Sequence, residues 1–562
     1  MDERPDQPTP EDAPTRPDVA ALGEAGAGSA DLAAPPGPRR RRWIPVTVGV
    51  ALVVFVAAGV GAFLLLRGSD EVLFDQVPAT ADVVVAAYLD PAASQKVNLF
   101  RMAERFPDMG TRDEVTGQVD DFLDEALADT GLTHEDLSWV GVEIAVWADV
   151  RGEAEFEGAA LIDSDDDAGA QATVDRLLES LREQGDDVTS TTHAGVEVWT
   201  IDETAALAYA DHTLILGSSP EAVGSTIDAG RGDVDAIDAS ADFQDAFADL
   251  PQARLFAAYT GIDGLTDALG DALATAEAAG SPINFGGAKS VAMTLSATED
   301  GLAVDWSQVN DPARMSPELV EVLDEPPHEN GALSMVPGDA FGVFAVEHMD
   351  ALAQESIDAL VEQEPSAAAD LEELGVTGSD GLLANLSGDL AIEAAPGGED
   401  PAAGALMVGV QDMARMETFI DDALADLGGA APTWTEEDHR GVTLRTLDDE
   451  TLPLTYAVVN GMLVIGSSPE HVARIVDVSQ DGGGLSQDEG FTAATADLEG
   501  ADALMFLDVP SVLQAVRDEL PPDEVASFDD EMGRNLDPIG HVVMGVEGDA
   551  TRQHMRFFVQ IP

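Results

Sequence analysis

Short apolar runs and helical patterns alternate along most of the chain, and one junction between them occurs twice. Residues 214–223 read LILGSSPEAV and residues 463–472 read LVIGSSPEHV, so that an apolar run ends in Gly-Ser-Ser-Pro-Glu and a helical pattern follows. Serine at the N-cap, proline at the first helical position and glutamate in the first turn are typical of a helix start. The pattern predicts two strand-to-helix junctions, whose capping residues are Ser219, Pro220, Glu221, Ser468, Pro469 and Glu470.

The runs around the first junction predict a mixture of strands and helices. Strands are predicted at 82–89, 141–148 and 156–162, a helix with one apolar face at 170–183, and a closing hairpin at 291–309. These assignments rest on the two-residue period of half-buried strands and the longer period of amphipathic helices.

The second half of the chain repeats this order. Three pairs of segments show the correspondence. The first copy has VPATADVVVAAYLD, GVEVWTI and SVAMTLSATEDGLAVDWSQV, and the second copy has, in the same order, VPGDAFGVFAVEHMD, GVTLRTL and HVVMGVEGDATRQHMRFFVQ. Agreement over many elements in one order indicates a tandem duplication. We predict an α+β fold made of two tandem copies of a mainly antiparallel sheet with helices on one face. The copies are placed at residues 70–310 and 332–562, with a linker at 311–331.

The N-terminal segment predicts a membrane anchor. Residues 43–66 carry no charge and are long enough to cross a bilayer as a helix. Four arginines, 39–42, precede this run and only Arg67 follows it, which places the N-terminus in the cytoplasm. A cleaved signal peptide is the alternative, but the run is long for one and no small-x-small cleavage pattern follows it. We therefore expect a disordered cytoplasmic tail at 1–42 and a single-pass cell-membrane protein whose bulk lies outside the cytoplasm.

The charge of the chain limits its partners. Asp and Glu number 108 against 26 Lys and Arg, a formal net charge of −82. Such a surface repels nucleic acid and anionic lipid. Because the acid is spread along the whole chain, adaptation to a salty environment is favoured over capture of a cationic ligand or divalent cation. The chain has no cysteine, which excludes disulfides, thiolate nucleophiles and zinc–cysteine sites.

Several residues could carry chemistry, and each has a simpler structural interpretation. Ser218, Ser219, Ser467 and Ser468 lack the Gly-x-Ser-x-Gly pattern of a hydrolase nucleophile, so helix capping is favoured. The acidic run 163–167 resembles a calcium loop.

That resemblance to a calcium loop is incomplete. Ala168 stands where the loop needs Gly and Val174 where it needs Glu. A helix-capping acidic turn is therefore favoured over weak divalent-cation binding.

Metal and cofactor motifs do not occur either. Neither His-x-x-x-His nor His-Glu-x-x-His is found among the nine histidines, which include His134, His193, His212, His348, His439 and His471. Lys96, one of two lysines, is more simply an ion-pair partner than a base. No phosphate-binding loop or dinucleotide fingerprint is present. We therefore predict no catalytic residue, no cofactor and no metal ligand.

Three features together resemble a known bacterial family. They are the single N-terminal anchor, the stretch VPATADVVVAAYLDPAASQKVNLFRMAERFP at 77–107, and the GSSPE junction. The chain is similar in these to the family called domain of unknown function 3352, and the resemblance implies an anchored, exported protein without assigned catalytic residues. The second copy lacks DPAASQK and has Met349-Asp350-Ala351-Leu352 there.

The sequence favours a non-enzymatic binding or scaffolding module of the cell envelope, held by its own transmembrane helix, with an envelope protein as partner. The reason is that the copies repeat apolar patterns and caps but not polar constellations. Two alternatives stay open: a hydrolase or metal-assisted enzyme with a site between the repeats, and envelope signalling through the cytoplasmic tail.

Overall fold

The computed structural model describes most of the chain from Leu73 to Pro562. The residues left out within that range are 90, 108–123, 125–126, 128–131, 151–155, 263–286, 327, 329, 364–365, 379–380, 398–399, 429–431, 448–453 and 499. The predicted tail and transmembrane helix, residues 1–42 and 43–66, lie outside the described residues. Within the described part, no helix has both the length and the apolarity that a membrane span requires.

The first copy supplies half of the strands. They are β1 (Val83–Tyr88), β2 (Val140–Val150), β3 (Phe156–Ser164), β4 (Val188–His193), β5 (Val196–Ile201), β6 (Ala205–Ala210), β7 (Thr213–Gly217), β8 (Phe256–Gly261), β9 (Ala288–Ala297) and β10 (Gly301–Asn310). Its helices are α2 (Ala93–Ala103), α4 (Asp167–Gln184), α5 (Pro220–Gly230) and α6 (Ala241–Phe247). Helix α8 (Pro317–Leu323) lies in the linker.

The second copy supplies the same strands in the same order. They are β11 (Gly342–Val346), β12 (Leu386–Gly397), β13 (Asp400–Val410), β14 (Trp434–His439), β15 (Val442–Leu447), β16 (Thr455–Val459), β17 (Met462–Gly466), β18 (Ala503–Asp508), β19 (His541–Gly548) and β20 (Arg552–Gln560). Its helices are α9 (Met349–Gln363), α10 (Ala367–Glu373), α11 (Met413–Gly428), α12 (Pro469–Asp481), α13 (Glu489–Ala494), α14 (Val509–Glu519), α15 (Pro522–Phe528) and α16 (Arg534–Leu536).

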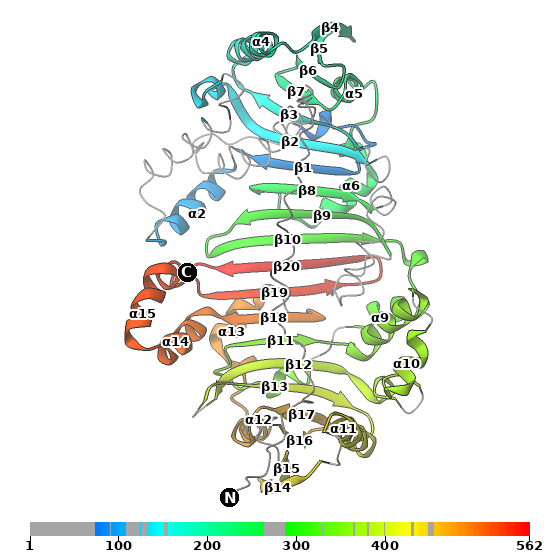
Figure 1. The fold of residues 1–562 in the computed structure, drawn as a ribbon, viewed down its shortest axis with the longest axis vertical. Coiled ribbons are helices and arrows are strands. Elements are labelled where there is room, and N and C mark those ends of the chain that lie inside the picture. The colour runs from blue at the N-terminus through cyan, green and yellow to red at the C-terminus, as the bar shows by residue number, and fades with distance from the viewer. Residues whose placement is uncertain are drawn as a thin grey trace, which may run out of the picture. The chain divides into compact units, whose positions relative to one another are not determined.

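All these strands join one 20-stranded antiparallel sheet (Figure 1). The order across it is β4-β5-β6-β7-β3-β2-β1-β8-β9-β10-β20-β19-β18-β11-β12-β13-β17-β16-β15-β14. The second half of this order mirrors the first. The predicted antiparallel sheet and duplication are therefore confirmed, and the two copies share one sheet.

The copies meet where the last strand of each pairs with its counterpart. Strands β10 and β20 run antiparallel, and Asp305 lies opposite Arg556, its own equivalent in the second copy. The Arg556 Nη1 lies 3.3 Å from the Asp305 Oδ1. A local twofold axis thus passes close to a buried acid in one copy and an arginine in the other.

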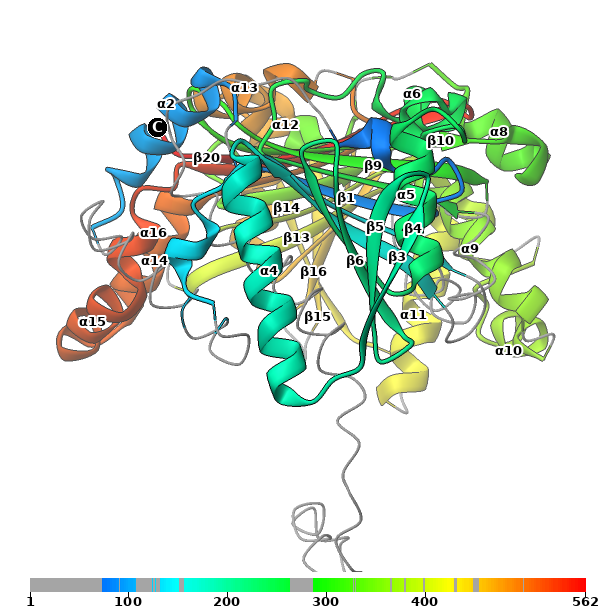
Figure 2. The same ribbon diagram turned by 90° about the horizontal axis from the view of Figure 1, so that it is seen from above.

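The prediction that helices cover one face of the sheet is wrong. Helix α5 packs Val223 and Ile227 against one face, which we call the outer face, whereas α4 packs Val174 and Leu178 against the opposite, inner face. In the second copy α12 covers the outer face and α11 the inner face. Figure 2 shows α6 and α12 along one side of the strands and α4 and α11 extending from the other.

Strand β6 shows why the sheet needs helices on both faces. Its sequence AALAYA is apolar at successive positions, so Leu207 contributes to the core under α4 while Ala206 and Ala208 contribute to the core under α5. A strand that is apolar on both sides needs a cover on both sides.

Candidate functional site

The serines of the two GSSPE junctions are all engaged with backbone groups. The Ser219 Oγ accepts from the Ala222 N–H at 3.0 Å at the start of α5, and the Ser468 Oγ accepts from the His471 N–H at 3.2 Å at the start of α12. Pro220 and Pro469 begin the helices, with Glu221 and Glu470 in their first turns.

The preceding serine of each junction holds a neighbouring strand. The Ser218 Oγ accepts from the Gly158 N–H at 3.1 Å and the Ser467 Oγ from the Gly404 N–H at 3.2 Å. These contacts account for the repeated Ser-Ser pair without a nucleophile.

Three carboxylates of the acidic run 163–167 are directed at different partners. The Asp163 Oδ2 accepts from the Val142 N–H at 2.8 Å, and the Asp166 side chain caps α4. Asp167 bonds the hydroxyl of Tyr209 and the ring of His212, both at 2.7 Å, and the hydrogen bond to Asp167 raises the pKa of His212. The run is a structural turn in this arrangement.

Lys96, the other residue singled out in the sequence, lies buried on α2.

One polar pair recurs in both copies, which corrects the expectation that no polar constellation is repeated. The His193 Nε2 lies 2.8 Å from the Asp228 Oδ1, and the His439 Nε2 lies 2.8 Å from the Asp477 Oδ1. Each pair joins the end of a hairpin strand to the helix that follows a GSSPE junction. The repeated pair is therefore a packing contact between hairpin and helix that both copies share.

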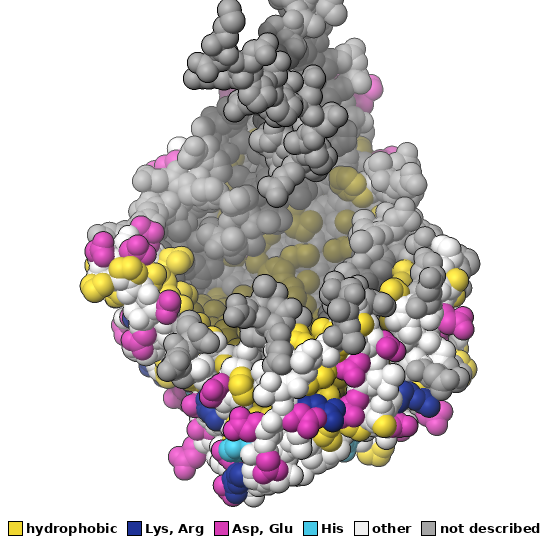
Figure 3. Space-filling model, turned by 60° about the horizontal axis from the view of Figure 1, so that its bottom comes forward, with side chains coloured by type: hydrophobic (Ala, Val, Ile, Leu, Met, Phe, Trp, Pro, Cys, Tyr) yellow, Lys and Arg dark blue, Asp and Glu magenta, His cyan; other side chains and the backbone are white. Residues whose placement is uncertain are grey.

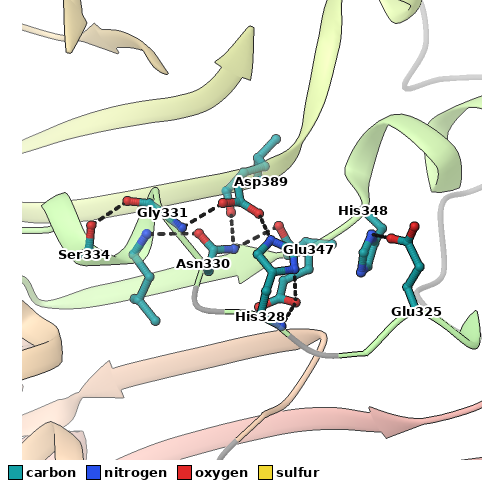
Figure 4. Close-up of polar contacts among 11 residues, drawn as sticks. Glu325, His328, Asn330, Gly331, Ser334, Glu347, His348 and Asp389 are labelled. Carbon is teal, nitrogen blue, oxygen red and sulfur yellow. Dashed lines mark hydrogen bonds and ion pairs between the residues drawn. The ribbon is translucent and has the colours of Figure 1, made fainter. Parts of the chain in front are cut away.

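A second group of polar residues converges where the linker meets the second copy (Figure 4). His328 belongs to the linker, Glu347 and His348 directly follow β11, and Asp389 lies on β12. The His328 Nδ1 lies 3.1 Å from the Glu347 Oε2, and its Nε2 lies 2.7 Å from the Asp389 Oδ1. The His348 Nδ1 lies 3.1 Å from the Glu325 Oε2. We call these five residues the linker cluster.

In the linker cluster, burial and the neighbouring acidic groups shift the pKa of His328 in opposite directions. Burial alone would lower the pKa of His328, but the hydrogen bond to Asp389 and the charge of Glu347 outweigh it and raise that pKa. Burial raises the pKa of Glu347. Nearby Asp502 has its pKa raised to about 6, by burial first and then by the charge of Glu347. Such shifted pairs mark candidate functional positions.

Sequence reasoning missed the linker cluster because its members come from separate segments. His348 belongs to no short zinc motif, and His328 lies in the linker sequence PPHENG. A usable signal was the Glu347-His348 pair at the end of a strand, at positions where the first copy has Tyr88-Leu89.

The inner face of the sheet is the other candidate, because its paired positions are apolar across both copies. Two adjacent rows of directly opposed residues cross the sheet. The first row is Leu216, Ala160, Val146, Val85, Ala258, Met293, Trp306, Met555, Val546, Ala503, Val346, Leu390, Val408 and Leu463. The second row is Ala87, Phe256, Leu295, Val304, Phe557, Met544, Met505, Phe344, Ile392, Leu406 and Ile465.

No charged side chain occurs in either row, although charged residues are frequent at the alternate positions facing outward. Asp305, Arg556, Glu393 and His554 all lie on the outer face of these strands. Figure 3 shows a hollow with hydrophobic side chains in its visible floor. Ile392 is 52% exposed and lines a depression of about 340 Å³. We call the two rows the apolar rows.

The fold and these features define a duplicated antiparallel α+β protein with an apolar inner sheet face. The chain belongs to the family described as "Protein of unknown function (DUF3352)", which matches residues 47–377 and again residues 377–549. The resemblance predicted from the sequence is therefore confirmed, and so are two tandem regions.

Comparisons with other proteins add little. No curated protein matches the chain significantly. Among solved structures, crystal forms I and III of TP0453 are 13% and 14% identical, with TM-scores of 0.25 and 0.24. Both matches cover 47% of this chain, and 90% and 91% of TP0453, respectively. TM-scores this low carry no argument about the present chain.

Proposed function

We propose that this protein is a membrane-anchored, extracytoplasmic, non-enzymatic binding module whose apolar rows hold the acyl chains of a lipid. The observation that carries the proposal is the unbroken pair of apolar rows in a chain of net charge −82. Half of the first row is buried, but apart from Ala87 the members of the second row are half-buried or, in Ile392, exposed. Contiguous apolar surface such as the second row provides usually marks an interaction site.

The chemistry of the apolar rows favours acyl chains over a protein partner. The backbone groups of these strands already bond to neighbouring strands, so a ligand gains little from hydrogen bonding there. Four methionines, Met293, Met505, Met544 and Met555, supply adaptable side chains. Fully covering one large apolar side chain stabilises a complex by about 1.5–3 kcal/mol.

The predicted anchor supports a lipid from the same membrane. Residues 67–72 separate the predicted transmembrane helix from Leu73, and six extended residues span at most about 20 Å. The net negative charge disfavours anionic headgroups, so a zwitterionic or neutral lipid is the expected ligand.

The alternative of a hydrolase between the repeats has less support. The copies meet there through the paired strands β10 and β20, and Asp305 at that junction is only 1% exposed. Signalling through the cytoplasmic tail concerns residues outside the described range and gains no support from the fold.

A photocrosslinking experiment tests the proposed function. The full chain in native-salt membranes is exposed to phosphatidylcholine that carries a diazirine in its acyl chain, and labelled peptides are mapped. We expect labels on β11, β12 and β20, and at least a tenfold loss of those labels in Ile392→Asp. Leu374→Asp, at a site 69% exposed outside the sheet, is the matched control and should label as the wild type does. Labels confined to residues 43–66, or equal labelling in Ile392→Asp, would contradict lipid binding on this face.

A further inference from the structure

We propose that His328, Glu347 and His348 form a binding site for a divalent transition metal, with Zn²⁺ the best fit. One ligand atom from each of these three residues lies within 4.8 Å of the other two. Two imidazoles and one carboxylate are a ligand set that suits zinc, whereas calcium and magnesium prefer oxygen ligands alone.

The carboxylates around the two histidines are arranged as supports for metal ligands. The His328 Nε2 bonds the Asp389 Oδ1 at 2.7 Å, and the His348 Nδ1 bonds the Glu325 Oε2 at 3.1 Å. A metal-binding histidine commonly donates its second ring N–H to a carboxylate, which orients the ring and makes the free nitrogen more basic. Both histidines thus have an outer carboxylate and one nitrogen left to face a metal.

His348 supplies an independent reason to expect a ligand. Its Nε2 is buried and has no hydrogen-bond partner among the described residues. A buried polar atom without a partner is unfavourable and calls for an explanation such as a bound ion. The backbone of His348 also has a φ of 55°, a left-handed conformation that is uncommon for this residue type and accumulates at functional positions.

The electrostatics favour a cation rather than an anion at this place. Glu347 is 4% exposed and Asp389 is also close, so two carboxylates face the His328 ring, and Asp502 adds a third acidic group nearby. A divalent cation would offset this negative charge directly. The side chain of His328 is 45% exposed, which gives an ion a route from solvent.

Without an ion, polar groups of the linker cluster already bond to one another, and this offers a competing, purely structural explanation. A protonated His328 can donate to both Glu347 and Asp389, and the Asn330 Nδ2 bonds the Val346 carbonyl at 3.0 Å, so the group could serve only to fasten the linker to β11 and β12. Zinc would displace the direct His328–Glu347 contact and leave the Asp389 bond in place. The two explanations therefore differ in metal affinity and not in the apo contacts.

The test is a Zn²⁺ titration of the full chain, treated with chelator, by isothermal calorimetry in molar NaCl with millimolar Mg²⁺ and Ca²⁺ to occupy surface acids. We expect one Zn²⁺ per chain, and at least a hundredfold weaker binding in His328→Ala and in His348→Ala. His212→Ala is the matched control, because His212 also pairs with a carboxylate, Asp167, but belongs to no group of three metal-binding side chains among the residues that the structure describes. The Zn²⁺ affinity of this variant should be unchanged.

A spectroscopic readout separates ligation from folding. Co²⁺ bound in place of Zn²⁺ should give visible ligand-field absorption in the wild type that is lost in His328→Ala, while the far-ultraviolet circular dichroism of the variant stays as in the wild type. The site is overturned if Mg²⁺ and Ca²⁺ abolish Zn²⁺ binding, if His212→Ala weakens it as much as His348→Ala, or if the wild type binds no Zn²⁺ at all.

Discussion

The buried pair of Glu393 and His471 joins a strand to a helix, and the first copy makes the equivalent strand-to-helix contact with different side chains. In the first copy the equivalent strand position is Trp147, whose indole N–H bonds the Thr226 hydroxyl of α5 at 3.0 Å. In the second copy Glu393 bonds the His471 ring of α12, and both side chains are buried. A neutral hydrogen bond between strand and helix is thereby replaced by one that involves a carboxylate.

We predict that His471→Ala destabilises the protein by about 3–5 kcal/mol, because it leaves the Glu393 carboxylate buried without its partner. Glu393→Gln/His471→Ala should recover part of this loss, since no charge then stays buried. Urea unfolding at constant salt measures both variants. A loss below about 1 kcal/mol for His471→Ala would show that water compensates Glu393.

The capping serines carry a smaller and local prediction. Ser219→Ala and Ser468→Ala should each lower the free energy of unfolding by about 1 kcal/mol, because each removes one acceptor for a helix N–H. Urea unfolding measures the loss, and Ser219→Asp and Ser468→Asp, which keep a capping oxygen, should restore most of it. Loss of lipid crosslinking in Ser219→Ala at unchanged stability would instead indicate a functional hydroxyl.

These serines were predictable, whereas the linker cluster was not. A cap depends on residues within one helical turn, so the order Ser-Pro-Glu is sufficient to identify it. His328, Glu347 and Asp389 come together only after the linker folds against two strands, and no short spacing encodes that contact. The same limit applies to His193 and Asp228, whose pairing depends on how a hairpin packs on α5.

At the scale of elements, strand periodicity predicted most strands but not their long-range pairing. The hairpin of β9 and β10 was recognised from Glu299-Asp300-Gly301 between two alternating runs. Nothing local in β10 identifies β20 as its other neighbour, so two sheets were expected where one exists. Helical periodicity predicts the helix at 170–183, which corresponds to α4, but it does not indicate which face of the sheet a helix covers, so helices on both faces were not expected.

The pairing of β10 with β20 has a pH-dependent consequence at Asp305 and Arg556. Burial raises the pKa of Asp305, although Arg556 and His554 act to lower it. The folded state therefore binds this proton more tightly than the unfolded chain, whose aspartate has a pKa of about 3.9. Ionisation of Asp305 removes stability as the pH rises from that unfolded value through the folded pKa.

We predict that Arg556→Ala destabilises the protein by about 3 kcal/mol at pH 8 and by less at pH 5. Without Arg556 the pKa of Asp305 rises further, so at low pH the carboxyl takes up a proton and the buried charge disappears. Urea unfolding across this pH range measures the effect, and Asp305→Asn/Arg556→Ala should remove the pH dependence of the difference. A penalty that is equal at pH 5 and pH 8 would contradict this account.

At the scale of the whole molecule, the apolar rows restrict where the acidic residues can lie. The chain has 108 Asp and Glu, and none occupies the paired inner-face positions of the apolar rows. The acid is therefore concentrated on the remaining surface, where carboxylates lie closer together than an even distribution would place them. Their mutual repulsion destabilises the folded state unless it is screened.

We predict that the melting temperature rises by about 10 °C or more when NaCl is increased from 0.1 to 1 M, because the screening length falls from about 10 to about 3 Å. Circular dichroism of the full chain in detergent measures the transition. Sucrose is the control, since it strengthens burial by exclusion from the protein surface without screening charge, and it should raise the melting temperature much less. A melting temperature that is independent of NaCl would mean that bound cations already neutralise the acid, and millimolar chelator should then lower it sharply.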